Sequence, residues 1–140
     1  MIILDTNVLS ELMKPAPSPE VVAWISSRLS TRELCLTTIT VAEILFGIEL
    51  MPRGKRRDSL LADAESTFAE DFARRIVPFD EPAARAFPEI AAIRRLAGRP
   101  TSLFDAQIAA IARASDALLA TRNTADFEGC GVRLVNPWRD

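Results

Sequence analysis

The chain of 140 residues contains no histidine and no tyrosine. The absence of histidine removes the commonest general base and the imidazole ligands of metal sites, and it excludes Ser-His-Asp or Cys-His catalysis within this chain. If the protein is an enzyme, its chemistry must therefore come from carboxylates, lysine, hydroxyl groups or a bound metal ion.

Cysteine is nearly absent as well. The two cysteines, Cys35 and Cys130, make no disulfide framework, and the chain has no metal-ligand spacing for zinc. Cys35 lies in the apolar run of residues 34–36 and is expected to be a small buried hydrophobic residue.

The sequence also lacks long apolar runs and an excess of basic residues. No stretch approaches the ~20 apolar residues of a membrane-spanning helix, and no basic segment precedes a long apolar one at the N-terminus. We therefore expect a cytoplasmic protein without membrane contact. The net charge of −2 argues against a dedicated nucleic-acid-binding module, but less against a nuclease, whose acidic site lowers the total charge.

What the chain does have is an alternation of short apolar stretches with segments of helical periodicity, over a length typical of one domain (residues 1–140). Strands are predicted over residues 2–4, 34–37, 76–79, 117–121 and 132–135. Helices are predicted over residues 6–14, 18–30, 40–51, 55–75, 80–97 and 102–112. This alternation predicts an α/β fold with a mainly parallel sheet and helices on both faces. Pro78 suggests that the third strand lies at an edge or ends there.

The first ten residues carry the strongest indication of a site. The run Ile2-Ile3-Leu4 is typical of a strand that is buried on both faces, and it ends at Asp5. Ligands of an open α/β sheet bind beyond the carboxyl ends of its strands, so Asp5 falls where a ligand is expected.

Four carboxylates follow predicted strands or open predicted helices: Asp5, Glu43, Asp105 and Asp126. In a parallel sheet, Asp5, Glu43 and Asp126 lie at the carboxyl end, whereas chain order alone leaves Asp105 at either end. Each acid also has an ordinary structural interpretation. Asp5 can cap a helix, and Glu43 can complete a capping box that begins at Thr40. Asp105 can favour the positive end of a helix capped by Ser102. Asp126 can be a solvated loop acid.

Taken together, these acids indicate a metal site. Carboxylates that converge in one crevice repel each other and raise each other's pKa, and a divalent cation removes that cost. Hard cations such as Mg²⁺ take oxygen ligands and keep several water molecules. A metal-activated water can then attack a phosphodiester bond while the metal stabilises the transition state. This chemistry suits a chain without histidine.

Small polar and basic residues accompany the acids. Hydroxyl and amide side chains that can orient the carboxylates or metal-bound waters are Thr6, Asn7, Thr121 and Asn123. Turn and cap chemistry is the alternative for each of them. Arg122 lies directly beside the predicted crevice and is a candidate phosphate contact. The basic run Arg53, Lys55, Arg56 and Arg57 is more typical of a solvated face or a partner surface.

Four motifs, in this order, resemble those of PIN-domain ribonucleases, and more narrowly the FitB-like branch of the VapC toxins. They are Leu4-Asp5-Thr6-Asn7-Val8-Leu9-Ser10-Glu11, Thr40-Val41-Ala42-Glu43, Phe104-Asp105-Ala106-Gln107-Ile108-Ala109 and Thr121-Arg122-Asn123-Thr124-Ala125-Asp126-Phe127. Phe46-Gly47-Ile48, Gly54-Lys55-Arg56-Arg57 and the ending Val135-Asn136-Pro137-Trp138 are similar to the same branch. The resemblance covers nearly the whole chain.

The resemblance implies a PIN-like three-layer α/β sandwich and a Mg²⁺- or Mn²⁺-dependent endoribonuclease that acts as the toxin of a toxin–antitoxin pair. It implies cleavage of RNA to a 5′-phosphate and a 3′-hydroxyl. It places Asp5, Glu43 and Asp105 in one acidic site. Our hypothesis for that site is a metal held by Asp5 and Asp105, with Glu43 completing the pocket directly or through water. The resemblance also implies a homodimer, an antitoxin that blocks the site, and binding of promoter DNA only through the antitoxin.

The chain departs from the family pattern at one position. Many members carry an aspartate directly after the Thr-Arg pair, where this chain has Asn123. Asp126, three residues later, either takes the place of this aspartate through a shifted loop or a bridging water, or has no role in the site. The departure motivates an alternative hypothesis: a catalytically weak PIN protein that acts mainly through its antitoxin complex in transcriptional autoregulation.

Overall fold

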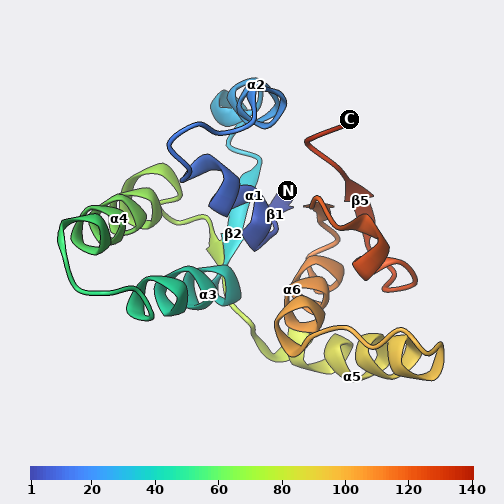
Figure 1. Ribbon diagram of the computed structural model, residues 1–140. Coiled ribbons are helices and arrows are strands. Elements are labelled where there is room, and N and C mark those ends of the chain that lie inside the picture. Colours follow the sequence, from blue (N-terminus) through green and yellow to red (C-terminus); the bar gives the residue numbers. More distant parts are fainter.

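The computed structural model describes residues 1–140 and places five short strands side by side in one sheet (Figure 1). The strands are β1 (Ile2–Leu4), β2 (Leu34–Thr37), β3 (Ile76–Val77), β4 (Leu118–Ala120) and β5 (Arg133–Val135). All neighbouring pairs are parallel, in the order β3-β2-β1-β4-β5. The predicted parallel sheet is therefore confirmed, and β3 is an edge strand that stops before Pro78, as that proline indicated.

Six α-helices join the strands, each close to its predicted place. They are α1 (Thr6–Leu12), α2 (Pro19–Ser26), α3 (Thr38–Glu49), α4 (Lys55–Ser66), α5 (Glu81–Leu96) and α6 (Leu103–Ala114). Three shorter helical segments are η1 (Leu29–Thr31), η2 (Thr67–Asp71), which continues α4, and η3 (Thr124–Phe127). None of the helices has the length and apolar composition that crossing a lipid bilayer requires.

The start of α3 differs from the prediction. Thr37, and not Thr40, is the N-cap, and the backbone N–H of Thr40 donates to the Thr37 hydroxyl at 3.1 Å. The reason is that β2 runs directly into α3, so the last strand residue already has the extended backbone that an N-cap needs. Glu43 therefore does not complete a capping box with Thr40, and its side chain is available for another role.

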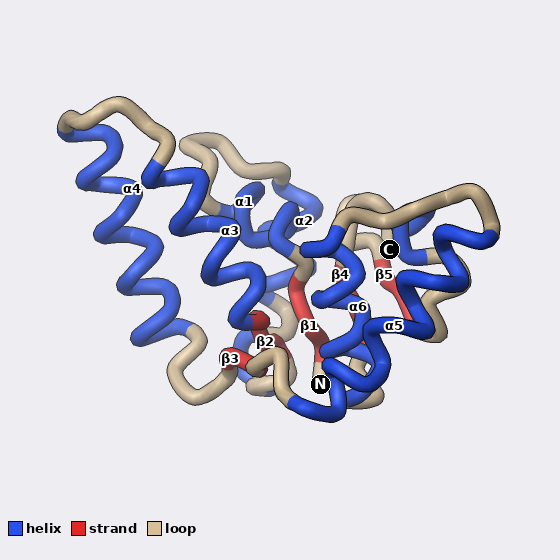
Figure 2. Tube along the Cα trace, turned by 90° about the horizontal axis from the view of Figure 1, so that it is seen from below, coloured by secondary structure: helices blue, strands red, loops and turns tan.

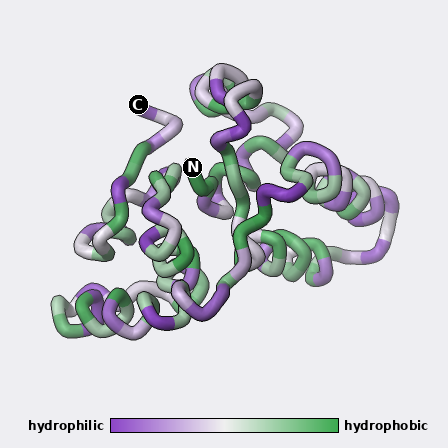
Figure 3. The backbone as a smooth tube through the Cα atoms, turned by 180° about the vertical axis from the view of Figure 1, so that it is seen from behind, coloured by the Kyte–Doolittle hydropathy of each residue, from purple (hydrophilic) through white to green (hydrophobic).

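The two faces of the sheet are covered by different helices. Alternate residues of a strand point to opposite faces. Accordingly, Ile2 and Leu4 pack into a core with residues of α1 to α4, whereas Ile3 packs into a second core with residues of α5, α6 and η3. Figure 2 shows α1 to α4 on one side of β1 and α5 and α6 on the other. In Figure 3 much of the central strand region has the hydrophobic colour, while hydrophilic segments gather on outer turns and loops. The molecule is thus a three-layer α/β sandwich.

The strand order has a reversal point between β1 and β4. From β1 the chain adds β2 and β3 on one side, and then β4 and β5 on the other. In open α/β sheets such a point is where ligands bind, beyond the carboxyl ends of the strands. The backbone N–H of Asp5 donates to Ala120 O, and that of Thr121 donates to Val135 O, each at 2.9 Å. These two hydrogen bonds between neighbouring strands fix the backbone of Asp5 and Thr121 at the reversal point.

The packing of α5 on the second core generates a test of the fold. Ile90 is completely buried on α5, whereas Leu96 on the same helix is 87% exposed. We expect Ile90→Ala to lower the free energy of unfolding by ~2–5 kcal/mol, because it removes buried apolar atoms and leaves a cavity. Leu96→Ala should change it by less than ~0.5 kcal/mol. Urea denaturation measures both, and equal losses would contradict this orientation of α5.

Candidate functional site

A polar crevice with a volume of about 400 Å³ lies beyond the carboxyl ends of β1 and β4. Seven of the residues predicted from the sequence line it: Asp5, Thr6, Asn7, Glu43, Asp105, Arg122 and Asn123. Four further lining residues were not predicted as site residues: Ser10, Glu11, Lys14 and Trp138. Residues from both ends and the middle of the chain therefore meet in one place.

Asp5 is both a helix cap and part of the crevice. Its side chain is buried, and its Oδ1 accepts a hydrogen bond from the backbone N–H of Thr6 at 2.8 Å. Its Oδ2 accepts from the Thr121 hydroxyl at 2.7 Å. That hydroxyl in turn accepts from Asn7 Nδ2 at 3.3 Å and from the backbone N–H of Asn123 at 3.1 Å. Asp5 therefore serves as a helix cap and as a crevice residue at once, and Asn7 and the Asn123 backbone fix its carboxylate through Thr121.

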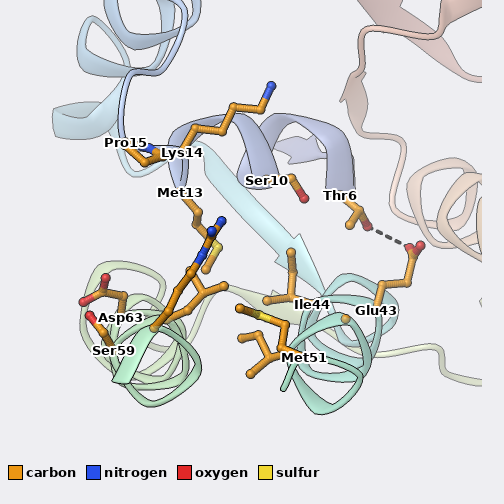
Figure 4. A pocket seen from close by; sticks show the side chains of 14 residues that line it. Thr6, Ser10, Met13, Lys14, Pro15, Glu43, Ile44, Met51, Ser59 and Asp63 are labelled. Atoms are coloured by element: carbon orange, nitrogen blue, oxygen red, sulfur yellow. Dashed lines mark hydrogen bonds between the residues drawn. The ribbon is translucent and has the colours of Figure 1, made fainter. Parts of the chain in front are cut away.

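Glu43 is held by a relay of threonine hydroxyls. The Thr6 hydroxyl donates to Glu43 Oε1 at 2.7 Å, as the dashed line in Figure 4 marks. A hydroxyl has one proton, so the 2.9 Å contact between Thr6 and Thr40 must be donated by Thr40. Thr40 is fully buried. Its role in this relay was not predicted, because Thr-x-x-Glu at a helix start is also the pattern of a capping box.

Asp105 joins the same crevice from the other face of the sheet. It lies in the first turn of α6, where its backbone N–H donates to the hydroxyl of the N-cap Ser102 at 3.1 Å. The structure places this turn at the carboxyl end of the sheet, which chain order had left open. Asp105 lines the crevice together with Asp5 and Glu43.

Asp126, the fourth acid predicted from the sequence, does not line the crevice with the other three. Asn123 lines the crevice, whereas Asp126 is exposed in η3 and is absent from the lining. The charge of Asp126 nevertheless contributes to the raised pKa of Asp105. Asp126 is therefore close enough to act on Asp105 electrostatically, while its side chain stays outside the crevice.

Burial raises the pKa of Asp5, Glu43 and Asp105, three of the four acids that line the crevice. For Asp5 the pKa rises to about 6, chiefly through burial and further through the charges of Asp105 and Glu43, against the opposing hydrogen bonds. Burial is also the main cause for Glu43 and for Asp105. None of the three carboxylates forms a salt bridge with a lysine or arginine. Asp5, Glu43 and Asp105 thus come together in the crevice without a cationic partner.

A larger apolar groove, with a volume of about 530 Å³, adjoins the acidic crevice between α1, α3 and α4 (Figure 4). The two cavities share Thr6, Ser10, Lys14 and Glu43. The hydrophobic residues that line the groove are Met13, Ile44, Ile48, Met51 and Leu60. From the basic run at the start of α4, Arg56 lines the groove, while Arg57 pairs with Glu49 at 2.9 Å. The groove and the acidic crevice are therefore adjacent cavities with a common wall.

The raised pKa of Asp5 predicts how the stability of the metal-free protein depends on pH. Because folding raises this pKa from 3.8 to about 6, the folded state binds the proton more tightly than the unfolded state. The resulting stabilisation is complete below about pH 4 and is lost as the pH rises through about 6. It amounts to about 3 kcal/mol, since one pKa unit corresponds to ~1.4 kcal/mol.

Asp5→Asn should remove this part of the pH dependence. We expect the wild type in EDTA to lose about 3 kcal/mol of unfolding free energy relative to the variant between about pH 4 and pH 7. Urea denaturation at several pH values measures this difference. Two parallel pH profiles would show that the pKa of Asp5 is not raised by folding.

Known proteins share both the sequence pattern and the fold of this chain. A family model described as PIN domain matches residues 2–129. Plasmid stability protein StbB of Pseudomonas syringae pv. tomato is 45% identical over 138 residues, which are 99% of each chain. VapC ribonuclease Y4jK of Sinorhizobium fredii is 41% identical over 138 residues, 99% of this chain and 98% of the relative. Toxin FitB of Neisseria gonorrhoeae is 40% identical over the full length of both chains.

A solved structure has the same fold. A chain in the structure of FitAB bound to an IR36 DNA fragment superimposes with a TM-score of 0.90 at 39% identity, covering 100% of this chain and 97% of that chain. The resemblance inferred from the four sequence motifs is therefore confirmed. The chain belongs to the PIN-domain family, and proteins named VapC ribonuclease and toxin FitB are among its relatives.

Proposed function

We propose that the protein is a metal-dependent endoribonuclease and the toxin of a toxin–antitoxin pair. The observation that carries the proposal is the crevice at the reversal point of the sheet, where Asp5, Glu43 and Asp105 come together without a cationic partner. A relative named VapC ribonuclease, similar over almost its whole length, supports this activity. Its substrate is cellular RNA, and we place its action in the cytoplasm.

The crevice residues fit a hard divalent cation such as Mg²⁺ or Mn²⁺. The donors are carboxylate and hydroxyl oxygens, which these ions prefer. No three acidic, cysteine or histidine side chains lie close enough together to hold one metal ion by themselves. We therefore assign the ion to Asp5 and Asp105, with water completing its shell and Glu43 acting directly or through water. When bound, the ion supplies an activated water and stabilises the charge that develops in phosphodiester hydrolysis.

The remaining residues of the crevice orient these acids and the substrate. Thr121 fixes one oxygen of Asp5, and Asn7 and the backbone of Asn123 fix Thr121 in turn. Thr6 fixes one oxygen of Glu43. Such hydrogen bonds hold a carboxylate in one orientation, and the lone pairs that they leave unused can face the ligand. Arg122 lines the same crevice and is assigned to a substrate phosphate.

A second candidate function follows from the fourth acidic position. Asn123 lines the crevice where an acid is common in the family, and Asp126 is exposed outside it. A chain with a weakened site would act mainly through its antitoxin complex in transcriptional autoregulation. This alternative predicts tight partner binding without RNA cleavage in either metal.

We assign the antitoxin to the apolar groove between α1, α3 and α4. The groove opens onto the acidic crevice, so a segment bound there can place a basic side chain against the unpaired acids. The relative FitB belongs to the complex FitAB, which has been solved on DNA. By this analogy, promoter DNA is bound through the antitoxin. The motif resemblance implies in addition that the toxin is a homodimer.

The nuclease proposal predicts RNA cleavage by partner-free protein in Mg²⁺ or Mn²⁺ and none in EDTA. Asp5→Asn and Asp105→Asn should each reduce cleavage by at least about 100-fold, since changing even an outer partner of a metal ligand costs about 10–100-fold. Asp126→Asn should reduce cleavage by less than about 10-fold, because that side chain lies outside the crevice. Asp116→Asn, at a fully exposed acid on a distant turn, is the matched control.

Two results would count against this assignment. Wild-type cleavage rates in Asp5→Asn or Asp105→Asn, with metal present, would remove these residues from the site. A folded wild type that binds its antitoxin tightly but cleaves no RNA in Mg²⁺ or Mn²⁺ would favour the regulatory alternative.

The groove assignment predicts a variant that separates partner binding from cleavage. Gly47 lines the groove on an exposed turn of α3, and a Cβ atom there meets nothing within 4 Å. Gly47→Leu should fill part of the groove and weaken antitoxin binding by at least about 10-fold, equivalent to ~1.4 kcal/mol. RNA cleavage should stay unchanged, because Gly47 does not line the crevice.

Calorimetric titration with the antitoxin measures the binding, and the cleavage assay is run on the same protein. Gly47→Ala is the control, since a single methyl group occupies little of the groove. Unchanged antitoxin affinity in Gly47→Leu would place the partner elsewhere.

A further inference from the structure

One wall of the acidic crevice is basic and has its own supporting structure. Arg122 and Lys14 both line the crevice, and neither forms a salt bridge with Asp5, Glu43 or Asp105. If these cations served only to neutralise the acids, they would be expected to contact them. Their positions therefore need another explanation.

Arg122 lies on an aromatic platform. Its guanidinium carbon is 5.2 Å from the centroid of the Trp138 ring, within the range of a cation–π contact. Trp138 is itself partly buried against the first hydrophobic core. Stacking on a fixed ring restricts a flexible side chain to few conformations while leaving its N–H groups free to donate. The guanidinium is thus held ready for a planar or tetrahedral oxyanion.

The buried side chain of Asn136 forms hydrogen bonds with the backbone of both Arg122 and Trp138. Asn136 Nδ2 donates to the carbonyl of Arg122 at 3.3 Å, and Asn136 Oδ1 accepts from the backbone N–H of Trp138 at 2.9 Å. The backbone N–H of Arg122 donates to Asn7 Oδ1 at 3.3 Å. The segment Asn136-Pro137-Trp138 therefore positions Arg122 from the C-terminal end of the chain.

Lys14 is held by a buried carboxylate. Glu11 is 6% exposed, and its Oε1 is 3.1 Å from Lys14 Nζ. Its Oε2 accepts from the backbone N–H of Ser18 at 3.3 Å. The hydrogen bond from Lys14 is the main reason that the pKa of Glu11 lies below its ordinary value, and the charge of Arg122 adds to it. One ionised glutamate thus faces two cations, and the wall keeps a net positive charge.

We propose that Arg122 and Lys14 form a subsite for a backbone phosphate of RNA next to the scissile phosphate, with Trp138 and Glu11 as the positioning residues of the two cations. This proposal rests on the ribonuclease function proposed above. The scissile phosphate belongs at Asp5 and Asp105, where the cation is assigned. Arg122 and Lys14 lie in the same crevice, so they contact the neighbouring part of the same RNA strand. Arginine suits this role because its fork of N–H groups matches phosphate oxygens.

RNA binding in the absence of cleavage tests the subsite. The probe is a fluorescent single-stranded RNA, and the protein is Asp105→Asn in EDTA, titrated at several salt concentrations. Adding Arg122→Gln should weaken binding by about 10-fold and reduce the slope of log K against log salt by about 0.7, the value for one phosphate contact with a single strand. Lys14→Gln should act in the same direction. Arg133→Gln is the matched control, since this exposed arginine lies at the amino end of β5.

A double-mutant cycle tests the positioning role of Trp138. Trp138→Leu should weaken RNA binding about as much as Arg122→Gln does, and it should add little when Arg122 is already changed. Trp138→Phe keeps an aromatic face and should retain most of the affinity. A general loss of structure would not give this pattern, because it would weaken binding with or without Arg122.

The outcomes separate this inference from the proposed function. Metal-dependent cleavage by the wild type, with unchanged affinity and salt slope in Arg122→Gln, would overturn the subsite and leave the ribonuclease intact. Equal losses in Arg122→Gln and Arg133→Gln, or additive losses in the Trp138 cycle, would also overturn it. A wild type that neither binds nor cleaves RNA would overturn both.

Discussion

The removal of three neighbouring carboxylates from water, Asp5 fully and Glu43 and Asp105 in part, is the constraint on which the site depends. Asp5, Glu43 and Asp105 share one crevice, their pKa values are raised, and no basic side chain of the chain neutralises them. The fold holds them there through hydrogen bonds from threonine hydroxyls and through backbone that the sheet fixes. The acids therefore favour an external positive charge. A divalent cation supplies it in the proposed catalyst, and a basic group of the antitoxin supplies it in the proposed inhibited complex.

The topology of the sheet explains why these residues meet. The strand order reverses between β1 and β4, so the loops after these two strands diverge and leave a crevice at their carboxyl ends. Asp5 and Thr121 are the first residues beyond the two strands. Glu43 comes from the helix that follows β2, and Asp105 from the helix that precedes β4. Helices on opposite faces of the sheet thus contribute to one site, and both hydrophobic cores must form before the crevice exists.

Local patterns in the sequence were sufficient to predict the helices and strands and to identify Asp5 as a site residue. The strand and helix-cap patterns that indicate them lie within a few residues of each other. Other features depend on contacts between distant segments. The position of Asp105 follows from the packing of α5 on α6, which chain order leaves open. Thr40 looked like a helix cap, since one spacing of threonine and glutamate suits both a capping box and the relay to Glu43. Trp138 gains its position through Asn136, a contact that no periodicity reveals.

The central claim is that the crevice acids bind a divalent cation in place of protons. Calorimetric titration of the partner-free protein with Mn²⁺, at about pH 6 and in buffers of different ionisation enthalpy, measures both affinity and proton release. The wild type should release protons as the ion binds, because the pKa of Asp5 is raised to about 6. Asp5→Asn should bind more weakly and release fewer protons. Equal Mn²⁺ affinity in the two proteins, without proton release from the wild type, would contradict the account.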